Sequence, residues 1–263
     1  MATAKSADTG AAFAFKDVDP EGEQTLEVMS QAPRFNRWMF ETIRPYFSGP
    51  ILEIGSGIGN ISSHLLDSGF ESYLSDVRPR YCDQLRATYG AHPACRAVVQ
   101  LDLVHPDFSR VYRHLLGRFG TVFALNVVEH IEDDHLALAN SQRLLRQGGR
   151  LIILVPAYQF LYNRLDRELC HFRRYTSGSL NRVFTNSGLD VERSFYFNLA
   201  GTFGWFVSGG LLHQKVPSRF MVSLYNVLVP LFRLVDRMTL RRLGLSVITI
   251  GRARDAVRLP AAA

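Results

Sequence analysis

The chain has few cysteines, and its sequence lacks the signatures of secretion and of membrane insertion. Its 263 residues include three cysteines, Cys82, Cys95 and Cys170, whose spacing fits neither a disulfide framework nor a zinc site. An apolar, glycine-rich stretch at residues 200–212 falls short of the ~20 residues that a membrane-spanning helix needs. The N-terminus has no charged-then-apolar secretory pattern. These absences predict a cytoplasmic protein with reduced thiols.

The sequence also lacks a strong excess of charge of either sign. With 47% hydrophobic and 21% charged residues, it has the composition of an ordinary globular protein. Its net charge of +6 permits nucleic-acid or anionic-lipid partners without requiring them, and much of the basic excess lies beyond residue 170. Residues 1–22, rich in small and charged residues, are expected to form a disordered tail. Residues 23–263 are expected to form one domain.

A glycine-rich turn near residue 55 organises the chain. Residues 51–54 are expected to form a short buried strand, residues 55–59 must turn sharply, and residues 60–66 have the apolar spacing of a helix. Such a unit exposes backbone N–H groups at the carboxyl end of a sheet, where open α/β sheets bind nucleotide-like ligands. Asn60 stands where a dinucleotide fingerprint has its third glycine, and no Gly-Lys-Ser/Thr of a P-loop follows. Both of those motifs are therefore disfavoured.

Acidic residues follow the next two predicted strands. The second strand, residues 71–75, ends at Asp76, and the third, residues 94–101, runs into Asp102. An acid at the tip of the second strand suits ribose, because a carboxylate offers two acceptor oxygens and no donor. The alternatives are a helix cap for the first acid and a solvated loop residue for the second. Strands alternating with helices, up to a wholly apolar strand at 151–155, predict a parallel doubly wound sheet.

The pattern E-x-G-x-G-x-G, from Glu53 to Gly59, resembles the first motif of class I S-adenosylmethionine-dependent methyltransferases of the bacterial small-molecule type. The resemblance covers about residues 35–198 and a final strand. It implies an α/β, Rossmann-like fold with a doubly wound seven-stranded sheet in the order 3-2-1-4-5-7-6, the last strand antiparallel, and S-adenosylmethionine as cofactor. The cofactor contacts that it implies are Glu53, Gly55, Ser56, Gly57, Gly59, Asp76, Val77, Asp102, Leu103 and Asn126.

Two further roles follow from this resemblance. In these methyltransferases the acid after the third strand receives the adenine amino group, and the next backbone N–H reaches a ring nitrogen, which assigns these roles to Asp102 and Leu103. Trp38 lies in an aromatic, helically spaced segment just before the glycine turn. One interpretation of this segment is a lid over the methionine half of the cofactor, and the other is a helix whose apolar stripe packs on the core.

A fourth strand at residues 120–125 runs into a stretch that contains Asn126, Glu129 and His130. It resembles the corresponding motif of small-molecule methyltransferases, and it lacks the two prolines and the aromatic residue of the nucleic-acid enzymes that methylate exocyclic amines. Ubiquinone-pathway O-methyltransferases have Glu, Glu and His in this pattern and can hold a divalent metal. Because Asn126 takes the place of the first carboxylate, a metal here has too few protein ligands. No metal is therefore expected.

Two inserts bear on the acceptor. The first, residues 156–176, should overhang the cofactor cleft because it follows the carboxyl end of a strand. His171 is a candidate general base, since an imidazole titrates near neutrality, and paired arginines can hold a carboxylate or phosphate. The alternative is a loop fixed by an internal pair between Asp166 and one arginine. The candidate acceptor contacts are Tyr158, Tyr162, Arg173, Arg174 and Tyr175.

The second insert, residues 199–243, combines an apolar glycine-rich segment with a strongly apolar helical stretch and a cluster of arginines at its far end. Three interpretations stay open: a helical lid over an apolar pocket, a dimer contact, or an interfacial helix on an anionic membrane. The apolar residues that suggest a pocket are Phe203, Trp205, Phe206, Leu211 and Leu212.

These features predict S-adenosylmethionine-dependent methyl transfer to a small or lipid-like acceptor, in small-molecule biosynthesis. His130 and His171 are the acid–base candidates, and Glu129 is expected to contact the cofactor or to orient one of them. The alternatives are an RNA or protein methyltransferase and a non-catalytic cofactor-binding scaffold, although a nucleic-acid partner is not expected. The second insert leaves room for a homodimer and for a peripheral contact with the inner face of the membrane.

Overall fold

The computed structural model describes residues 20–211, 214, 216 and 218–254. The strands of this part are β1 (Ile51–Ile54), β2 (Ser72–Asp76), β3 (Cys95–Gln100), β4 (Phe119–Leu125), β5 (Leu145–Pro156), β6 (Leu189–Phe197) and β7 (Ser246–Ala253). The helices are α1 (Pro20–Ser30), α2 (Pro33–Ile43), α3 (Ser62–Asp67), α4 (Pro79–Tyr89), α5 (Phe108–Val111), α6 (Asp134–Leu144), α7 (Arg164–Glu168), α8 (Ser177–Asn186), α9 (Leu199–Trp205) and α10 (Arg219–Met238). Shorter turns are η1 (Arg44–Tyr46), η2 (Val128–His130), η3 (Gln159–Leu161) and the π-helical η4 (Phe206–Leu211).

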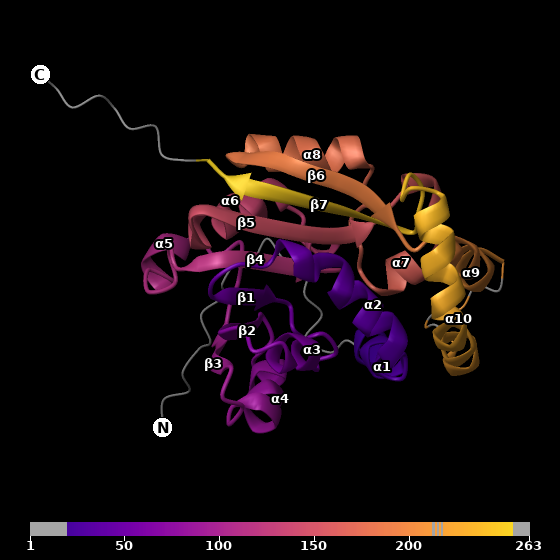
Figure 1. Ribbon diagram of the computed structural model, residues 1–263, viewed down its shortest axis with the longest axis horizontal. Helices are drawn as coiled ribbons and strands as arrows, with labels where there is room; N and C mark the ends of the chain where they lie inside the picture. The colour runs from indigo at the N-terminus through magenta and orange to yellow at the C-terminus, as the bar shows by residue number, and fades with distance from the viewer. Residues whose placement is uncertain (1–19, 212–213, 215, 217, 255–263) are drawn as a thin grey trace, which may run out of the picture.

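The strands form one seven-stranded sheet in the order β3-β2-β1-β4-β5-β7-β6 (Figure 1). Strands β1 to β5 pair in parallel, because a helical segment returns the chain between them. β7 runs antiparallel to both of its neighbours, β5 and β6. The predicted Rossmann-like order and the antiparallel last strand are therefore confirmed.

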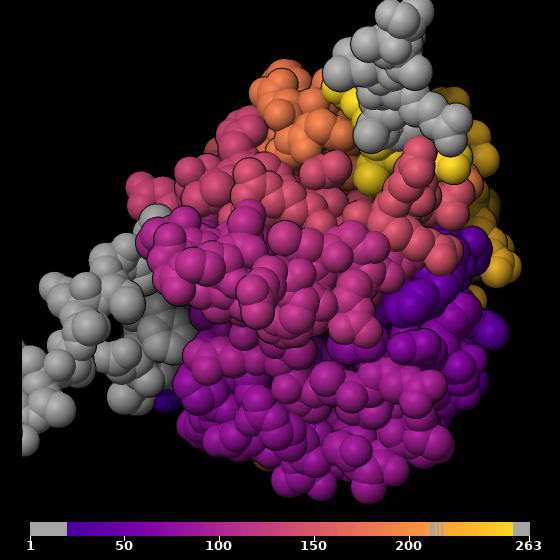
Figure 2. Space-filling model, turned by 90° about the vertical axis from the view of Figure 1, so that its left-hand side faces the viewer, coloured from indigo at the N-terminus to yellow at the C-terminus, as the bar shows by residue number. Residues whose placement is uncertain are grey.

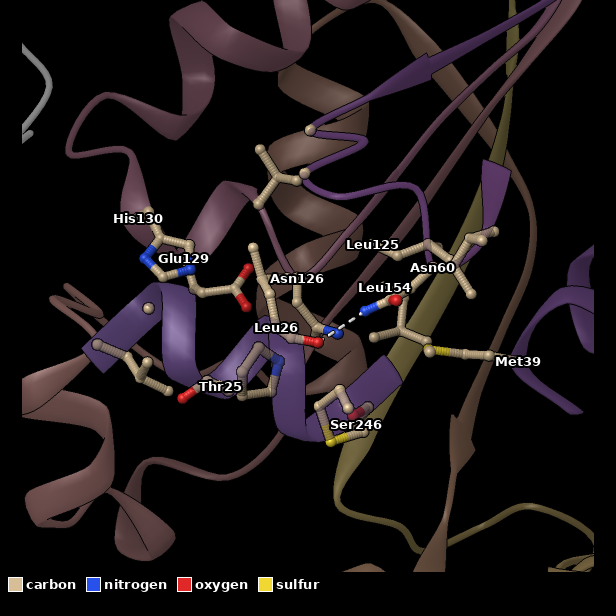
Figure 3. A pocket seen from close by; sticks show the side chains of 18 of the residues that line it. Thr25, Leu26, Met39, Asn60, Leu125, Asn126, Glu129, His130, Leu154 and Ser246 are labelled. Atoms are coloured by element: carbon tan, nitrogen blue, oxygen red, sulfur yellow. Dashed lines mark hydrogen bonds between the residues drawn. The ribbon is translucent and has the colours of Figure 1, made fainter. Parts of the chain in front are cut away.

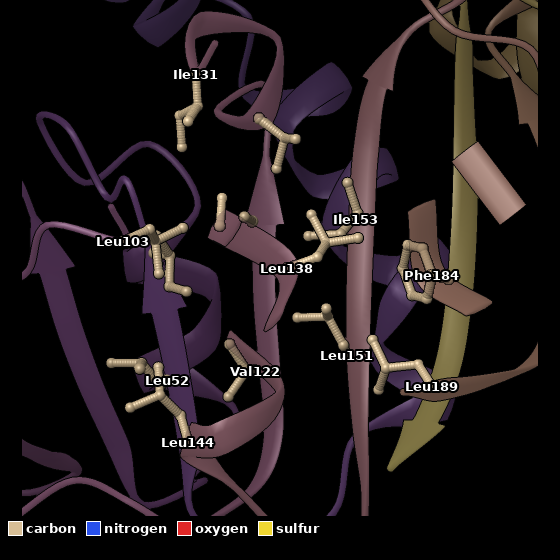
Figure 4. Close-up of a cluster of buried hydrophobic side chains, with 14 of the residues drawn as sticks. Leu52, Leu103, Val122, Ile131, Leu138, Leu144, Leu151, Ile153, Phe184 and Leu189 are labelled. Atoms are coloured by element: carbon tan, nitrogen blue, oxygen red, sulfur yellow. The ribbon is translucent and has the colours of Figure 1, made fainter. Parts of the chain in front are cut away.

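Helices cover both faces of the sheet, so the core has two layers. Successive residues of a strand point to opposite faces, and β1 accordingly gives Leu52 to one layer and Ile51 to the other. Figure 4 shows the first layer, where Ile153 of β5 and Phe184 of α8 are among the buried side chains. Burial on both faces explains why the strand predicted at 151–155 is wholly apolar.

β5 begins at Leu145, well before the predicted residue 151. Its register with β4 shifts along the strand: Leu145 pairs with Phe119, but Arg150 pairs with Thr121. Gly148 has a φ of 68°, which glycine adopts without steric cost. Residues 147–150, which include two glycines, thus form an irregularity inside the strand and not a turn before it.

The N-terminal helix starts earlier than the sequence suggested. α1 begins at Pro20, a favoured first position because its missing N–H has no partner there anyway. Residues 20–22 of the predicted tail are therefore helical, and residues 1–19 lie outside the described part of the chain. Val28 of α1 is buried with Val222 of α10. Helices α1 and α10 therefore pack on the same side of the molecule, although they are far apart in the sequence.

The second insert folds onto the end of the sheet at which β6 finishes, where Figure 1 shows α9 and α10 side by side. Asp236 of α10 fixes it there, because its carboxylate accepts hydrogen bonds from the backbone N–H groups of Asn198 (2.7 Å) and Leu199 (2.9 Å). Leu212 and the side chain of Leu211 lie outside the described residues. Among the residues that are described, no helix has the length and apolar character needed to cross a membrane.

Candidate active site

The carboxyl ends of β1 to β5 open into one cavity of about 480 Å³. Figure 3 shows part of its lining, with Thr25 and Leu26 of α1 near Asn126, which follows β4, and Leu154 of β5. Residues of α7, α9 and α10 line it as well. The volume lies in the range of cofactor and small-molecule sites.

The glycine turn brings bare backbone to this cavity. Gly55 has a φ of 70°, and a Cβ atom on it would lie 2.4 Å from a methyl carbon of Val127. Gly57, with a φ of 53°, donates its N–H to Oδ2 of Asp76 at 3.0 Å. Side chains at these positions would be strained or would clash, so only glycine lets the turn approach the cavity so closely.

Asp76, at the tip of β2, lines the cavity although it is largely buried. Its second oxygen, Oδ1, accepts the N–H of Arg78 at 2.9 Å. Burial raises the pKa of this carboxyl group, and the hydrogen bonds from Arg78 and Gly57 oppose the rise. The two backbone donors fix the carboxylate while leaving it further acceptor positions.

The remaining acids of the predicted cofactor set also reach the cavity. Asp102 lines it, and its Oδ1 accepts the N–H of Val104 at 2.9 Å. Glu53 lines it too, with Oε2 accepting the hydroxyl of Ser62 at 2.6 Å, and burial raises its pKa to about 7. The other predicted cofactor residues that line the cavity are Gly55, Ser56, Gly57, Val77, Leu103 and Asn126.

A group of three acid–base side chains occupies the other part of the cavity. Glu129, His130 and His171 each offer a donor atom, and these atoms lie within 4.8 Å of one another. The two imidazole rings meet edge to face with centroids 4.7 Å apart. Glu129 is fully buried, and neither of its carboxyl oxygens has a hydrogen-bond partner in the described structure. Sequence reasoning named all three residues but could not show that the insert carries His171 to the other two.

Asp166 of α7 holds His171 in place. Its Oδ1 lies 2.9 Å from Nδ1 of His171, and it also pairs with the Arg174 guanidinium through Nε at 2.8 Å and Nη2 at 3.1 Å. Burial alone would raise the pKa of Asp166, but the bonds from His171 and Arg174 hold it below the usual value. Burial lowers the pKa of His171, and the Asp166 bond only partly opposes this. The imidazole is therefore neutral near pH 7.

Replacing Glu129 with glutamine is expected to remove a pH dependence of stability. Burial raises the pKa of Glu129 from its ordinary value of 4.5 to about 8. Between these pH values the unfolded chain releases the proton and the folded chain keeps it, so stability falls as pH rises. At pH 8 the variant should be more stable by on the order of a few kcal/mol, or about 5–10 °C in Tm, with little difference at pH 5. Melting curves across this range, with exposed Glu132→Gln as the control, test it; parallel curves for the wild type and Glu129→Gln would contradict it.

The structure places few of the predicted acceptor contacts at the cavity. Of the five, Arg174 lines the cavity, and the other four do not. Arg173 pairs with Asp134 at 3.0 Å, and the hydroxyl of Tyr175 donates to the same carboxylate at 2.8 Å. Tyr162 donates to the backbone oxygen of His171 at 2.7 Å, and Tyr158 stacks on Tyr196. The charged groups of this loop are thus paired, Arg174 with Asp166 of the loop itself and Arg173 with Asp134 of α6.

Trp38 and Gly59 lie outside the cavity as well. The Trp38 ring is 2% exposed and packs against Phe197 with centroids 4.4 Å apart, so of the two interpretations of this segment the core-packing one describes Trp38. Gly59 faces the Tyr89 ring instead of the cavity, because its turn has already bent away.

Sequence reasoning missed the element that does cover the glycine turn, which is α1. The closest heavy atom to a Cβ built on Gly57 is a methyl carbon of Leu26, at 3.2 Å, and the side chain of Asn60 donates to the Leu26 carbonyl at 3.1 Å. Thr25 and Met29 of the same helix line the cavity. The signal available in the sequence was the helical spacing of apolar residues that begins near Thr25.

A sheet of this order, with a glycine turn after β1 and acids at the ends of β2 and β3, defines the fold of class I S-adenosylmethionine-dependent methyltransferases. A family model described as Methyltransferase domain matches residues 27–194, which is more than half of the chain, and the protein belongs to that family. It is an S-adenosylmethionine-dependent methyltransferase. The comparison with curated proteins gave no match.

Solved structures share the fold at low sequence identity. Phosphoethanolamine N-methyltransferase 2 of Haemonchus contortus, in complex with phosphomonomethylethanolamine and S-adenosylhomocysteine, aligns with a TM-score of 0.57 and 13% identity over 88% of this chain and 58% of that one. A SAM-dependent methyltransferase from Archaeoglobus fulgidus gives 0.52 and 16% over 82% and 94%. The [4+2]-cyclase SpnF gives 0.55 and 12% over 85% and 81%. At these identities the likeness shows the fold alone, and the acceptor has to be argued from the site.

Proposed function

We propose that this methyltransferase transfers the methyl group to a hydroxyl of a small or lipid-like acceptor, with His171 as the general base. The observation that carries the proposal is the 2.9 Å contact between Nδ1 of His171 and the buried Asp166. An ionised carboxylate can only accept, so Nδ1 carries the hydrogen and Nε2 keeps its lone pair. A neutral imidazole in that tautomer, lining the cavity, is suited to remove a proton.

The cofactor occupies the side of the cavity formed by the glycine turn and the acids in this proposal. Asp76 accepts the ribose hydroxyls, since two backbone N–H groups already hold its oxygens in place. Asp102 receives the adenine amino group beside the backbone of Leu103. Glu53 and Asn126 line the same cavity and complete the predicted cofactor contacts.

The second insert gives the acceptor side an apolar wall. Trp205 of α9 and Met221 and Val222 of α10 line the cavity, and the Arg174 guanidinium lies 4.9 Å from the Trp205 ring centroid. Apolar side chains suit the hydrophobic body of a lipid-like acceptor. Since Arg173 is paired with Asp134 and Arg174 with Asp166, they do not present a phosphate-binding surface to an RNA strand.

The protein needs to do little to help break the bond between the sulfur and the methyl group, because the sulfonium methyl of the cofactor is already electrophilic. Its tasks are to hold the acceptor oxygen in line and to take its proton as the new bond forms. His171 takes that proton in this proposal, and Asp166 stabilises the imidazolium that results. Glu129 and His130 orient the acceptor hydroxyl.

Label transfer from S-adenosylmethionine tests the proposal. The purified protein, given methyl-labelled cofactor, is incubated separately with a lipid extract, a small-molecule extract, total RNA and a protein extract. We expect label in the lipid or small-molecule fraction. Label in RNA or protein would establish the corresponding rival activity, and tight cofactor binding without transfer to any fraction would indicate a scaffold.

Methyl transfer is expected to persist after metals are removed. The base in this proposal is His171 held by Asp166, which needs no metal to accept a proton. The sequence argues against a metal because position 126 carries an amide and not a carboxylate. The structure weakens that argument, because it brings His171 beside Glu129 and His130 as a third donor. Activity after dialysis against EDTA is the measurement. A loss that Mg²⁺, Mn²⁺ or Zn²⁺ restores would mean that these three residues hold a catalytic ion.

A further inference from the structure

The outer face of α10 carries a continuous apolar stripe. Its exposed apolar residues alternate in spacing between four and three, which places them on one side of the helix. They are Phe220, Leu224, Val227, Leu231, Leu234 and Met238. Phe220 and Met238 are both 74% exposed, and an exposed apolar surface of this extent marks an interaction site. α10 stands at one end of the molecule in Figure 1, and Figure 2, viewed from the opposite end, shows only a margin of the gold segments.

A second cavity, of about 380 Å³, adjoins the C-terminal half of the same helix and is called here the arginine pocket. Four arginines line it, one from β6 and three from α10 or just after it: Arg193, Arg233, Arg237 and Arg241. Arg233 pairs with Glu41 of α2 at 2.8 Å, and Arg193 donates to the Tyr46 hydroxyl at 3.0 Å. These contacts hold two of the guanidinium groups in fixed positions.

Positive charge in the arginine pocket exceeds negative charge. Four arginines against Glu41 leave its lining residues with a charge of +3. The nearby Asp236 attracts Arg241, but its carboxylate already accepts two backbone N–H groups. Burial lowers the pKa of Arg241, and repulsion from Arg193 and Arg237 adds to the effect. An anion in this pocket would relieve that repulsion, and phosphate oxygens match the fork of a guanidinium group.

The charges argue against a second copy of the chain as the occupant of the stripe. Pairing two α10 helices antiparallel would bring Arg219 of one copy toward Arg237 of the other. The acid within α10 is Asp236, which is 1% exposed and cannot balance them. An anionic surface, by contrast, complements the arginines and accepts the apolar stripe at once.

We propose that α10 docks on an anionic lipid membrane, with its stripe among the acyl chains and a lipid phosphate in the arginine pocket. Arg233 and Arg237 are spaced one turn apart on the side of the helix that lines the arginine pocket, and the long side chain of an arginine can extend to the headgroup level. On its inner side the helix lines the active-site cavity through Val222 and Tyr225. Docking therefore places the cavity close to the bilayer. Entry of a lipid-like acceptor from the membrane rests on the proposed function, but docking does not.

Sedimentation with vesicles tests the docking. The full chain is expected to co-sediment with phosphatidylcholine vesicles that contain phosphatidylglycerol and not with pure phosphatidylcholine. Arg237→Gln should weaken binding about fivefold, and Leu231→Gln about tenfold. The matched controls are Arg113→Gln and Val111→Gln, which change an exposed arginine and an exposed apolar residue in and beside α5 and should leave binding unchanged. Equal losses in the controls and the α10 variants would overturn the proposal.

Two further measurements separate other occupants. Calorimetry with inorganic phosphate detects a soluble phosphate ligand, and its binding to a protein that ignores both vesicle types would refute the docking. Light scattering detects a dimer, and a dimer that Leu231→Gln dissociates, again without vesicle binding, would assign the stripe to a second copy. Methyl transfer to a detergent-dissolved extract is measured on the same proteins. Transfer without vesicle binding refutes the docking alone, whereas vesicle binding without transfer refutes the proposed function alone.

Discussion

Replacing His171 with glutamine is expected to reduce methyl transfer about 10²- to 10⁴-fold, the usual contribution of a positioned general base. Affinity for S-adenosylmethionine should stay within about twofold, because the imidazole lies in the acid–base group and not among the residues proposed to bind the cofactor. Glutamine keeps a polar group of similar reach toward Asp166 but cannot take up a proton. Single-turnover rates and calorimetry on the same preparation measure the two quantities.

The pH profile separates a base from a merely structural histidine. Burial lowers the pKa of His171, so wild-type activity should fall on the acid side, as pH drops through a value below 6.5. The residual activity of His171→Gln should lack that acidic limb. His130→Gln is the matched comparison, since its ring lies 4.7 Å from that of His171 and lines the same cavity. If His130→Gln rather than His171→Gln loses the limb, the base has been assigned to the wrong residue.

The side of the cavity formed by the glycine turn could be predicted from the sequence because the elements that build it are neighbours in the chain. A strand, a glycine turn and a helix follow one another without interruption, so Gly55 and Gly57 had to lie at the carboxyl end of the sheet. Parallel strands all end at that edge, which placed Asp76 and Asp102 beside them. The regular alternation predicted a parallel doubly wound sheet, and the strand order came from the family resemblance.

The acceptor side could not be predicted to the same degree because it depends on contacts between distant segments. Arg173 and Arg174 follow one another in sequence, yet one pairs with Asp134 at the start of α6 and the other with Asp166 of α7. A sequence shows that a loop is charged but not which charges its own fold neutralises. The aromatic stripe of α2 posed a similar problem. Its spacing showed that Trp38 and Met39 belong to an amphipathic helix, but the two lie in different surroundings, Trp38 in the core and Met39 at the cavity.

The insert also changes what the fourth-strand motif means. In the sequence, Glu129 and His130 are two adjacent side chains near the amide of Asn126, and they do not by themselves indicate a catalytic or metal site. Folding brings His171 into reach and buries the Glu129 carboxyl group without a partner. An unpaired buried carboxyl group costs stability, so its position facing the cavity indicates a functional role. The motif and the insert therefore form one site, which neither would have disclosed separately.

Replacing Asp76 with alanine is expected to weaken S-adenosylmethionine binding about 10- to 100-fold, since hydrogen bonds to a charged group contribute roughly 1.5–3 kcal/mol. Each Asp76 oxygen already accepts one backbone N–H, from Gly57 and from Arg78, and each has a further acceptor position for a ribose hydroxyl. Calorimetric titration with the cofactor and with S-adenosylhomocysteine measures the loss. Asp83→Ala, which removes an exposed acid of α4, is the control and should bind normally.

Asp76→Asn distinguishes loss of the ribose contact from collapse of the glycine turn. The amide matches the carboxylate in shape, but its single oxygen can serve only one of the two backbone donors, and its nitrogen faces the other. We therefore expect a loss of affinity close to that of Asp76→Ala while the melting temperature falls by less than in the alanine variant. Near-normal affinity in Asp76→Asn, with a folded and stable protein, would show that Asp76 only braces the N–H groups of Gly57 and Arg78, and the ribose would need another acceptor.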